Sequence, residues 1–134
     1  MNDHTQNEVA IRELVENWAS AVRRKDLDAI LLNHSANILM FDVPPPLASK
    51  GLDAYSKTWD LFFAWAHDPV VFNITEMDIA AGDDVAFVIA LMRCAGTESN
   101  GQAGELDFRL TMGLRKIEAQ WIVVHEHHSI PATQ

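Results

Sequence analysis

The hydrophobic period of the chain changes once, close to residue 70, and this change constrains the fold more than any other feature. Before it, apolar residues recur three and four positions apart, which is typical of amphipathic helices. After it, four apolar runs rich in β-branched residues are separated by short polar turns, which is typical of antiparallel strands. Helices followed by a meander of strands predict an α+β fold, with the helices packed on one face of a strongly curved, mostly antiparallel sheet.

Two helices are predicted at the start of the chain. The first covers about residues 6–24, and Thr5 and Glu8 have the spacing of a capping box at its beginning. Asp26 is expected to cap a short second helix. The apolar line of this second helix extends as far as His34.

Further elements follow from composition and turn residues. Residues 37–43 predict a strand that Pro44-Pro45-Pro46 ends, because proline cannot continue a strand ladder. Aromatic residues at helical spacing predict a third helix over 52–66. Four further strands, joined as hairpins, are predicted over residues 70–81, 85–97, 105–117 and 121–129.

Size and charge narrow the class of protein. A chain of 134 residues and 15.0 kDa predicts a single domain over residues 1–134. Ten basic against nineteen acidic residues give a net charge of −9, so neither nucleic acid nor a membrane surface is an expected partner. Cys94 is the single cysteine, the first residues are polar, and no apolar run approaches 18 residues. These features predict a cytoplasmic protein.

Strand alternation predicts which side chains face the core. In the run over 85–97, the larger apolar side chains share one face and Cys94 lies among smaller ones on the other. We expect the larger face to point inward, and Arg93 shares it. In the next run, Leu106, Phe108 and Leu110 begin a second inward row. The opposite, outer face of the sheet is expected to meet a second subunit.

Several residue blocks resemble the NTF2-like superfamily, in particular its SnoaL-like and ketosteroid isomerase-like members. They are Lys25-Asp26-Leu27-Asp28-Ala29-Ile30, Phe41-Asp42-Val43-Pro44, Ser49-Lys50-Gly51 and the ending Trp121…His125-Glu126-His127-His128-Ser129. The resemblance implies a cone of bent sheet with helices across its mouth, an apolar pocket between them, and a homodimer through the outer sheet face. The superfamily contains enzymes, transport factors and oligomerisation modules, so the fold alone does not give the function.

Asp42 lies where the steroid isomerases hold their general base, so the resemblance implies that it faces the pocket and moves a proton. A carboxylate in an apolar pocket is suited to this work because burial raises its affinity for a proton. A second interpretation is that Asp42 caps the turn at Pro44-Pro45-Pro46, because aspartate is a favoured turn residue.

The remaining isomerase residues do not match. Trp18, His34 and Trp59 occupy the positions of the tyrosine donor and its supporting tyrosines, and Leu110 occupies that of a protonated aspartic acid. Without those donors, steroid isomerisation by the family mechanism is not expected. Trp18 and Trp59 either donate through the indole nitrogen or are core residues. We predict a ligand-binding wall made by Trp18, His34, Trp59, Phe62 and Phe108.

Arg93 is the basic residue of greatest interest, because its alternation places a guanidinium on the predicted inner face. A buried arginine needs an anionic partner, and Asp42, Glu126 or an anionic end of the ligand would supply one. The competing interpretation is that Arg93, close to the end of its strand, extends to solvent.

The last strand offers an acid and a base. Alternation groups Glu126 with His128, and the isomerase register turns this face inward, where the two would act together in proton transfer. Alternatively His127 and Ser129, which belong to the recurrent family ending, form the functional pair. His125 and His127 are too few ligands for a metal site, and no cofactor motif is present, so neither metal nor cofactor is expected.

Two hypotheses follow. In the first, the protein is a small isomerase, cyclase or hydratase that uses Asp42, assisted by His128 or His34, on a small apolar organic ligand with a carbonyl group. In the second, it is a non-catalytic domain of the same fold that binds a small ligand or dimerises.

Overall fold

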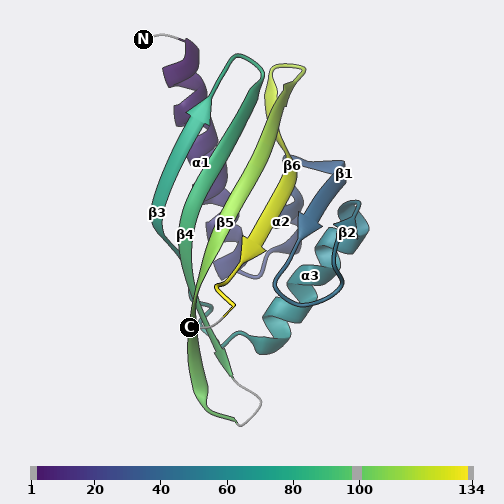
Figure 1. Ribbon diagram of the computed structural model, residues 1–134, viewed down its shortest axis with the longest axis vertical. Coiled ribbons are helices and arrows are strands. Elements are labelled where there is room, and N and C mark those ends of the chain that lie inside the picture. Colours follow the sequence, from purple (N-terminus) through teal and green to yellow (C-terminus); the bar gives the residue numbers. More distant parts are fainter. Residues whose placement is uncertain (1–2, 98–100, 133–134) are drawn as a thin grey trace.

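A computed structural model of the chain describes residues 3–97 and 101–132, and in them three helices lie on one side of a curved sheet (Figure 1). The elements are α1 (Asp3–Arg23), α2 (Leu27–Leu31), β1 (His34–Phe41), β2 (Ser49–Lys50), α3 (Leu52–Trp65), β3 (Phe72–Ala81), β4 (Val85–Thr97), β5 (Ala103–Ile117) and β6 (Gln120–Ser129). This arrangement confirms the predicted α+β class. None of the described helices combines the length and apolar character needed to cross a bilayer.

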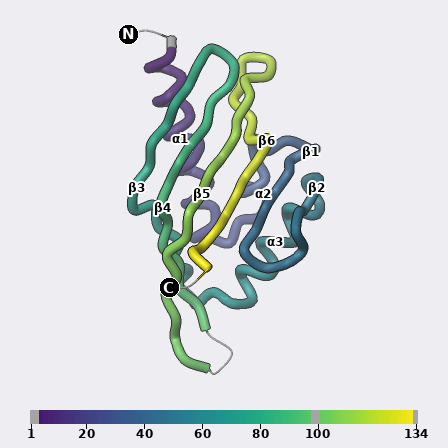
Figure 2. The backbone as a smooth tube through the Cα atoms, viewed as in Figure 1, coloured from purple at the N-terminus to yellow at the C-terminus, as the bar shows by residue number. Residues whose placement is uncertain are grey.

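The sheet has six strands in the order β2-β1-β6-β5-β4-β3. Neighbouring strands are antiparallel except β1 and β6, which are parallel. The sheet is curved and open, with β2 and β3 at its edges. Figure 2 shows the last strand, β6, lying beside β1. This pairing brings residues about ninety positions apart into contact.

The start of the chain corrects two predictions. Helix α1 already includes Asp3, so Thr5 lies within the helix and is not its N-cap. The predicted cap of α2 is confirmed, because the Asp26 side chain accepts a hydrogen bond from the Ala29 backbone N–H at 3.2 Å. His34 does not extend the second helix. It begins β1, after Asn33 adopts a positive φ of 59°.

The predicted strands of the second half are confirmed with small shifts of their ends. The strand expected over 37–43 is shifted toward the N-terminus, so Asp42 lies just beyond the end of β1. The two-residue strand β2 was not predicted. The turn predicted at Asn100-Gly101 lies partly outside the described residues, because Asn100 is among those not described.

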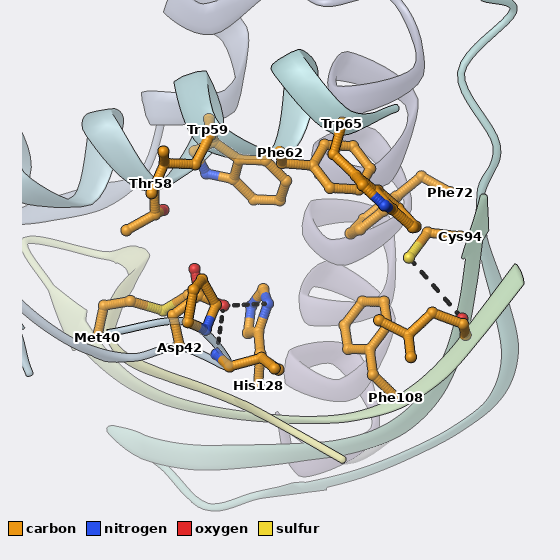
Figure 3. Close-up of a pocket in the computed structure, with 14 residues that line it drawn as sticks. Met40, Asp42, Thr58, Trp59, Phe62, Trp65, Phe72, Cys94, Phe108 and His128 are labelled. Carbon is orange, nitrogen blue, oxygen red and sulfur yellow. Dashed lines mark hydrogen bonds and ion pairs between the residues drawn. The ribbon is translucent and has the colours of Figure 1, made fainter. Parts of the chain in front are cut away.

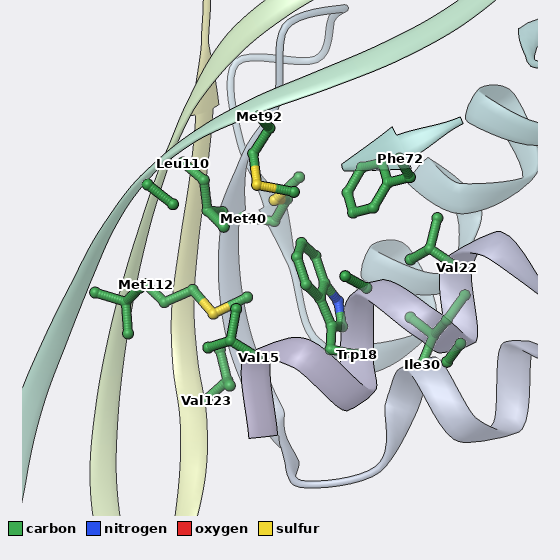
Figure 4. Close-up of a cluster of buried hydrophobic side chains, with 14 of the residues drawn as sticks. Val15, Trp18, Val22, Ile30, Met40, Phe72, Met92, Leu110, Met112 and Val123 are labelled. Carbon is green, nitrogen blue, oxygen red and sulfur yellow. The ribbon is translucent and has the colours of Figure 1, made fainter. Parts of the chain in front are cut away.

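The predicted orientation of β4 is wrong. Its large residues, Val85, Phe87, Ile89 and Leu91, are 42–55% exposed on the outer face. The smaller ones face inward and are buried, namely Ala86, Val88, Ala90, Met92 and Cys94. The reason lies in the packing partners. Bulky side chains from α1 and β5, with Trp18 at their centre, already fill the inner space (Figure 4).

The predicted inward row of β5 is confirmed. Phe108, Leu110, Met112 and Leu114 are buried and Leu106 is partly buried. Antiparallel partners share a face, and Leu110 pairs with both Ala90 on β4 and His128 on β6. The small inner residues of β4 and the polar inner residues of β6 therefore belong to one surface, which faces the helices.

Candidate functional site

A cavity of about 390 Å³ lies between α3 and the inner face of the sheet (Figure 3). Its wall is mainly apolar and aromatic, and its polar side chains are few. The lining residues are Met40, Asp42, Val43, Pro44, Thr58, Trp59, Leu61, Phe62, Trp65, Phe72, Cys94, Leu106, Phe108 and His128. An apolar cavity with a few converging polar groups is the usual form of a small-molecule site.

Asp42 and His128 meet at this cavity. Oδ1 of Asp42 lies 4.0 Å from Nδ1 of His128, and both side chains are largely buried. The same Oδ1 accepts a hydrogen bond from the backbone N–H of Val43 at 2.8 Å. Asp42 therefore supports the turn after β1 and also lines the cavity.

Side chains alternate along β6 as the isomerase register predicts, with Glu126 and His128 on the inward face. Glu126 is 0% exposed and His128 is 7% exposed on the inner face, whereas His127 is exposed on the outer face. Nε2 of His128 lies 3.0 Å from Oε1 of Glu126. The His128 ring stacks on Phe108, with 5.4 Å between ring centroids, and this contact holds the ring against the cavity wall.

Beneath the cavity wall lies a buried cluster made of His34, Tyr55, Glu126 and His128. The Tyr55 hydroxyl donates to Oε2 of Glu126 at 2.6 Å, and Nε2 of His34 lies 2.7 Å from the same oxygen. The hydroxyl in turn accepts a hydrogen bond from the Trp18 indole N–H at 3.1 Å. The inward-facing residues of α1, β1, α3 and β6 thus converge on one carboxylate.

The electrostatics of the cluster follow from burial and charge. Burial alone would raise the pKa of Glu126, but hydrogen bonds from His128 and His34, together with their charges, outweigh it and lower the pKa to about 2. Burial, followed by the Glu126 charge, raises the pKa of Tyr55 well above its usual value. The carboxylate is therefore ionised and the phenol neutral at physiological pH.

Trp59 lies in the wall of the cavity and is 3% exposed. Its indole Nε1 is buried and has no hydrogen-bond partner among the described residues. The indole N–H lies near the Tyr55 hydroxyl and acts to lower the Tyr55 pKa, against the effect of burial. The two groups are not aligned for a hydrogen bond. The nitrogen therefore lies on the side of Tyr55, behind the cavity wall, and is not exposed to the cavity.

Arg93 is not part of the site, and its predicted inward orientation is wrong. The side chain is half exposed on the outer face of β4 and forms a bidentate pair with Asp107 on β5, at 2.8 and 3.2 Å. Their hydrogen bond raises the pKa of Arg93 and lowers that of Asp107. Arg93 therefore contacts neither Asp42 nor Glu126, and it cannot hold an anionic end of a ligand in this cavity.

Comparison with known proteins identifies the family of this chain and supports its fold. The family model of the SnoaL-like domain matches residues 11–133 of this chain. The chain belongs to the SnoaL-like family. It is also similar to the crystal structure of an NTF2-like protein of unknown function from Pseudomonas putida KT2440, with 35% identity, a TM-score of 0.83, and coverage of 95% of this chain and 88% of that one. No curated protein has a matching sequence.

Two more distant structures have the fold of this SnoaL-like domain. A ketosteroid isomerase-like protein from Erwinia carotovora atroseptica SCRI1043 is 18% identical, with a TM-score of 0.78 over 96% of this chain and 97% of that one. The association domain of CaMKII from C. elegans is also 18% identical, with a TM-score of 0.74 over 96% of this chain and all of that one. At such identity the likeness extends to the fold alone.

Cys94 of the SnoaL-like domain was predicted on the outer face, and this is wrong. It is 3% exposed on the inner face and lines the cavity, where its Sγ lies 3.8 Å from the Leu106 carbonyl oxygen. Burial raises the pKa of its thiol to about 12. The thiol is therefore protonated at neutral pH and is not poised as a nucleophile.

The other predicted wall residues divide into two groups. Trp59, Phe62 and Phe108 line the cavity, whereas Trp18 and His34 lie behind it and support the buried cluster. Tyr55 was not predicted as a site residue, although it belongs to the apolar line of the third helix and is the single tyrosine of the chain. Within residues 3–97 and 101–132, no three histidine, cysteine or acidic side chains are grouped so that they could hold a metal ion.

Proposed function

We propose that this protein is a small enzyme of the isomerase, cyclase or hydratase type that transfers a proton on a small, neutral, apolar carbonyl compound. The observation that carries the proposal is the pair formed by Asp42 and His128, with 4.0 Å between Oδ1 and Nδ1, at the wall of an otherwise apolar cavity. A carboxylate and an imidazole so close together can pass one proton between the substrate and each other.

The lining supports the chemical class of the substrate. Aromatic side chains of Trp59, Phe62, Trp65, Phe72 and Phe108 suit a flat hydrocarbon body. No lysine or arginine is among the lining residues, so a carboxylate or phosphate group on the ligand would have no cationic partner.

In the proposed reaction, Asp42 removes a proton from the carbon next to the carbonyl group. The electron pair of the broken C–H bond moves toward the carbonyl oxygen, so that an enolate forms in the apolar cavity. His128 assists by sharing the proton held at Asp42, and the proton then returns to the same or a different carbon. No atom is gained or lost, so the minimal reaction needs no co-reactant.

Hydrogen exchange tests this proposal without knowledge of the natural substrate. Neutral aryl and cyclic ketones such as 2-tetralone are incubated with the protein in D2O, and deuterium incorporation next to the carbonyl is followed by NMR. We expect the wild type to accelerate exchange of at least one ketone that it binds. Asp42→Asn should slow that exchange by about 10²–10⁴-fold, the usual contribution of a general base.

Arg93→Ala is the matched control, because its side chain lies on the outer face and should leave exchange unchanged. Equal exchange rates for wild type and Asp42→Asn would show that Asp42 is not the base. If the wild type accelerates exchange of none of the ketones that it binds, the catalytic proposal is overturned.

A second candidate function, self-association, is favoured by the outer face of β4. Val85, Phe87, Ile89 and Leu91 form a row of large apolar side chains that are 42–55% exposed. Such a row is typical of a protein interface. The CaMKII association domain from C. elegans, which has the same fold, is named for association. We propose that a second copy of this chain covers the row in a homodimer, which is compatible with either a catalytic or a non-catalytic cavity.

A further inference from the structure

The hydrogen atoms of the buried cluster can be assigned from its geometry, and the assignment gives Glu126 a role. Oε2 of Glu126 is 2.6 Å from the Tyr55 hydroxyl and 2.7 Å from Nε2 of His34, and Oε1 is 3.0 Å from Nε2 of His128. Because the carboxylate is ionised, it can only accept hydrogen bonds. All three neighbours must therefore donate to it.

His34 is the most constrained of the three. Its Nδ1 lies 2.9 Å from the backbone carbonyl oxygen of Leu32, which can only accept, so Nδ1 bears a hydrogen. Its Nε2 faces the Glu126 carboxylate and bears a hydrogen as well. His34 is thus an imidazolium ion, buried and paired with Glu126, as a buried charge requires.

Tyr55 and His34 together occupy Oε2 of Glu126 and leave Oε1 to His128. The Tyr55 hydroxyl uses its single hydrogen on Glu126 and accepts from the Trp18 indole, so it has no second proton to offer. Oε1 therefore receives the Nε2 hydrogen of His128. The ring cannot easily turn over, since it stacks on Phe108 and meets Trp18 and Trp59 edge to face.

We infer that Glu126 is a positioning residue. Clamped by His34 and Tyr55, it fixes the proton of His128 on Nε2, so that Nδ1 carries the free lone pair and faces Asp42 and the cavity. This role rests on the proposed function, because it prepares His128 to take a proton from Asp42 or the substrate. A carboxylate that orients a histidine from behind in this way selects its tautomer.

Side-chain NMR of ¹⁵N-histidine-labelled protein tests the assignment with no substrate present. We expect His34 to show protons on both nitrogens and His128 to show the Nε2–H tautomer. His127→Gln serves as the matched control, because this histidine is exposed on the outer face and its loss should move neither signal. A neutral His34, or a proton on Nδ1 of His128, in the wild type would overturn the inference.

Two variants test the clamp itself. Tyr55→Phe removes one hydroxyl and keeps the ring that stacks beside His34, with 5.0 Å between centroids. It should raise the minor Nδ1–H tautomer of His128 by about tenfold, corresponding to ~1.4 kcal/mol. Glu126→Gln should remove the second proton of His34. Unchanged His128 tautomers in a folded Tyr55→Phe variant would show that the clamp does not position the ring.

The catalytic consequence is read from the pH profile of ketone exchange. The titratable groups that face His128 are Asp42 and Glu126, while its other neighbours, Trp18, Trp59 and Phe108, do not titrate. Tyr55→Phe should lower the exchange rate about ten- to a hundredfold and displace the acidic limb of the profile, with little change in ketone affinity.

The two readouts separate the two proposals. If the NMR pattern is as expected and no ketone exchanges, the cluster is assigned correctly and the proposed function is wrong. If exchange depends on Asp42 but the His128 tautomer is mixed, the function stands and the positioning role fails. A loss of rate in Tyr55→Phe without a change in the pH profile would also count against positioning.

Discussion

Single residues decide the chemistry of this site, and the clearest case is Glu126. The carboxylate is fully buried, and two of its three donors, His128 and His34, hold its pKa at about 2 although burial acts in the opposite direction. Because the folded-state pKa lies below the value of 4.5 for a free glutamate, ionised Glu126 stabilises the fold above pH 4.5. That stabilisation is lost as the pH falls from 4.5 toward 2.

We therefore predict an acid-dependent difference between the wild type and Glu126→Gln. The difference in unfolding free energy should be greatest near pH 6 and should shrink by roughly 3 kcal/mol toward pH 2, the equivalent of the pKa shift. Urea unfolding at a series of pH values measures it. A difference that is constant with pH would show that Glu126 is not ionised against the two histidines.

Arg93 illustrates what a residue-level argument from sequence lacks. Alternation established correctly that Arg93 shares a face with Phe87, Ile89 and Leu91, but not which way that face points. Asp107, which alternates with the predicted inward residues Leu106 and Phe108, pairs directly with Arg93 across β4 and β5. The register of β4 and β5 places Arg93 on the same face as Asp107, which is the outer face. This register is a property of the sheet and is not encoded in either strand alone.

At the scale of elements, the contact between α3 and β4 closes one side of the cavity. Ala66, at the end of α3, pairs with Gly96 of β4, and the Trp65 ring lies directly on this glycine. A Cβ atom at position 96 would overlap the Trp65 indole. The absence of a side chain here lets the helix end approach the strand and keeps Trp65 in the cavity wall.

Gly96→Ala should therefore destabilise the protein by about 1–3 kcal/mol, because the indole or the strand must move. Gly113→Ala on β5 is a suitable control, since its Cβ would meet the nearest atom at an ordinary 3.5 Å. Thermal unfolding compares the two variants. In the double variant Gly96→Ala with Trp65→Ala, the cost of the added methyl should largely disappear; additive costs would contradict the proposed overlap.

The elements of the second half could be predicted because their sequences carry a local signal. Strands β3 to β6 were found with small errors at their ends, since alternating apolar residues and polar turns act over a few neighbouring residues. Strand β2 has two residues and exists only through pairing with β1, so it has no period to detect. The capping-box spacing at Thr5 was misleading, because the helix extends past it to Asp3.

At the scale of the whole molecule, the open sheet leaves one apolar row uncovered. Phe87→Ser and Ile89→Ser together remove two of its four large side chains, which are 49% and 51% exposed. We predict that the double variant is monomeric under conditions where the wild type is dimeric, as measured by sedimentation. The loss of stability of the isolated chain should be small, because these side chains contribute little to its own core.

Thr111→Ser, on the same outer face, is the control for that experiment and should leave the oligomeric state unchanged. A wild type that sediments as a monomer at all concentrations would refute the homodimer. The cavity lies on the inner face of the sheet and the apolar row on its outer face, so the two proposals are tested separately.

The sequence by itself determined the order of elements, the α+β class, and the inward alternation of Glu126 with His128, because all of these depend on short-range periods. It also indicated Asp42, through a family resemblance. Only the tertiary structure decided the direction of the β4 face, the exclusion of Arg93, and the convergence of Tyr55 and His34 on Glu126. Those features depend on strand register and on which side chains already fill the space beneath the helices, and neither is encoded within any one segment.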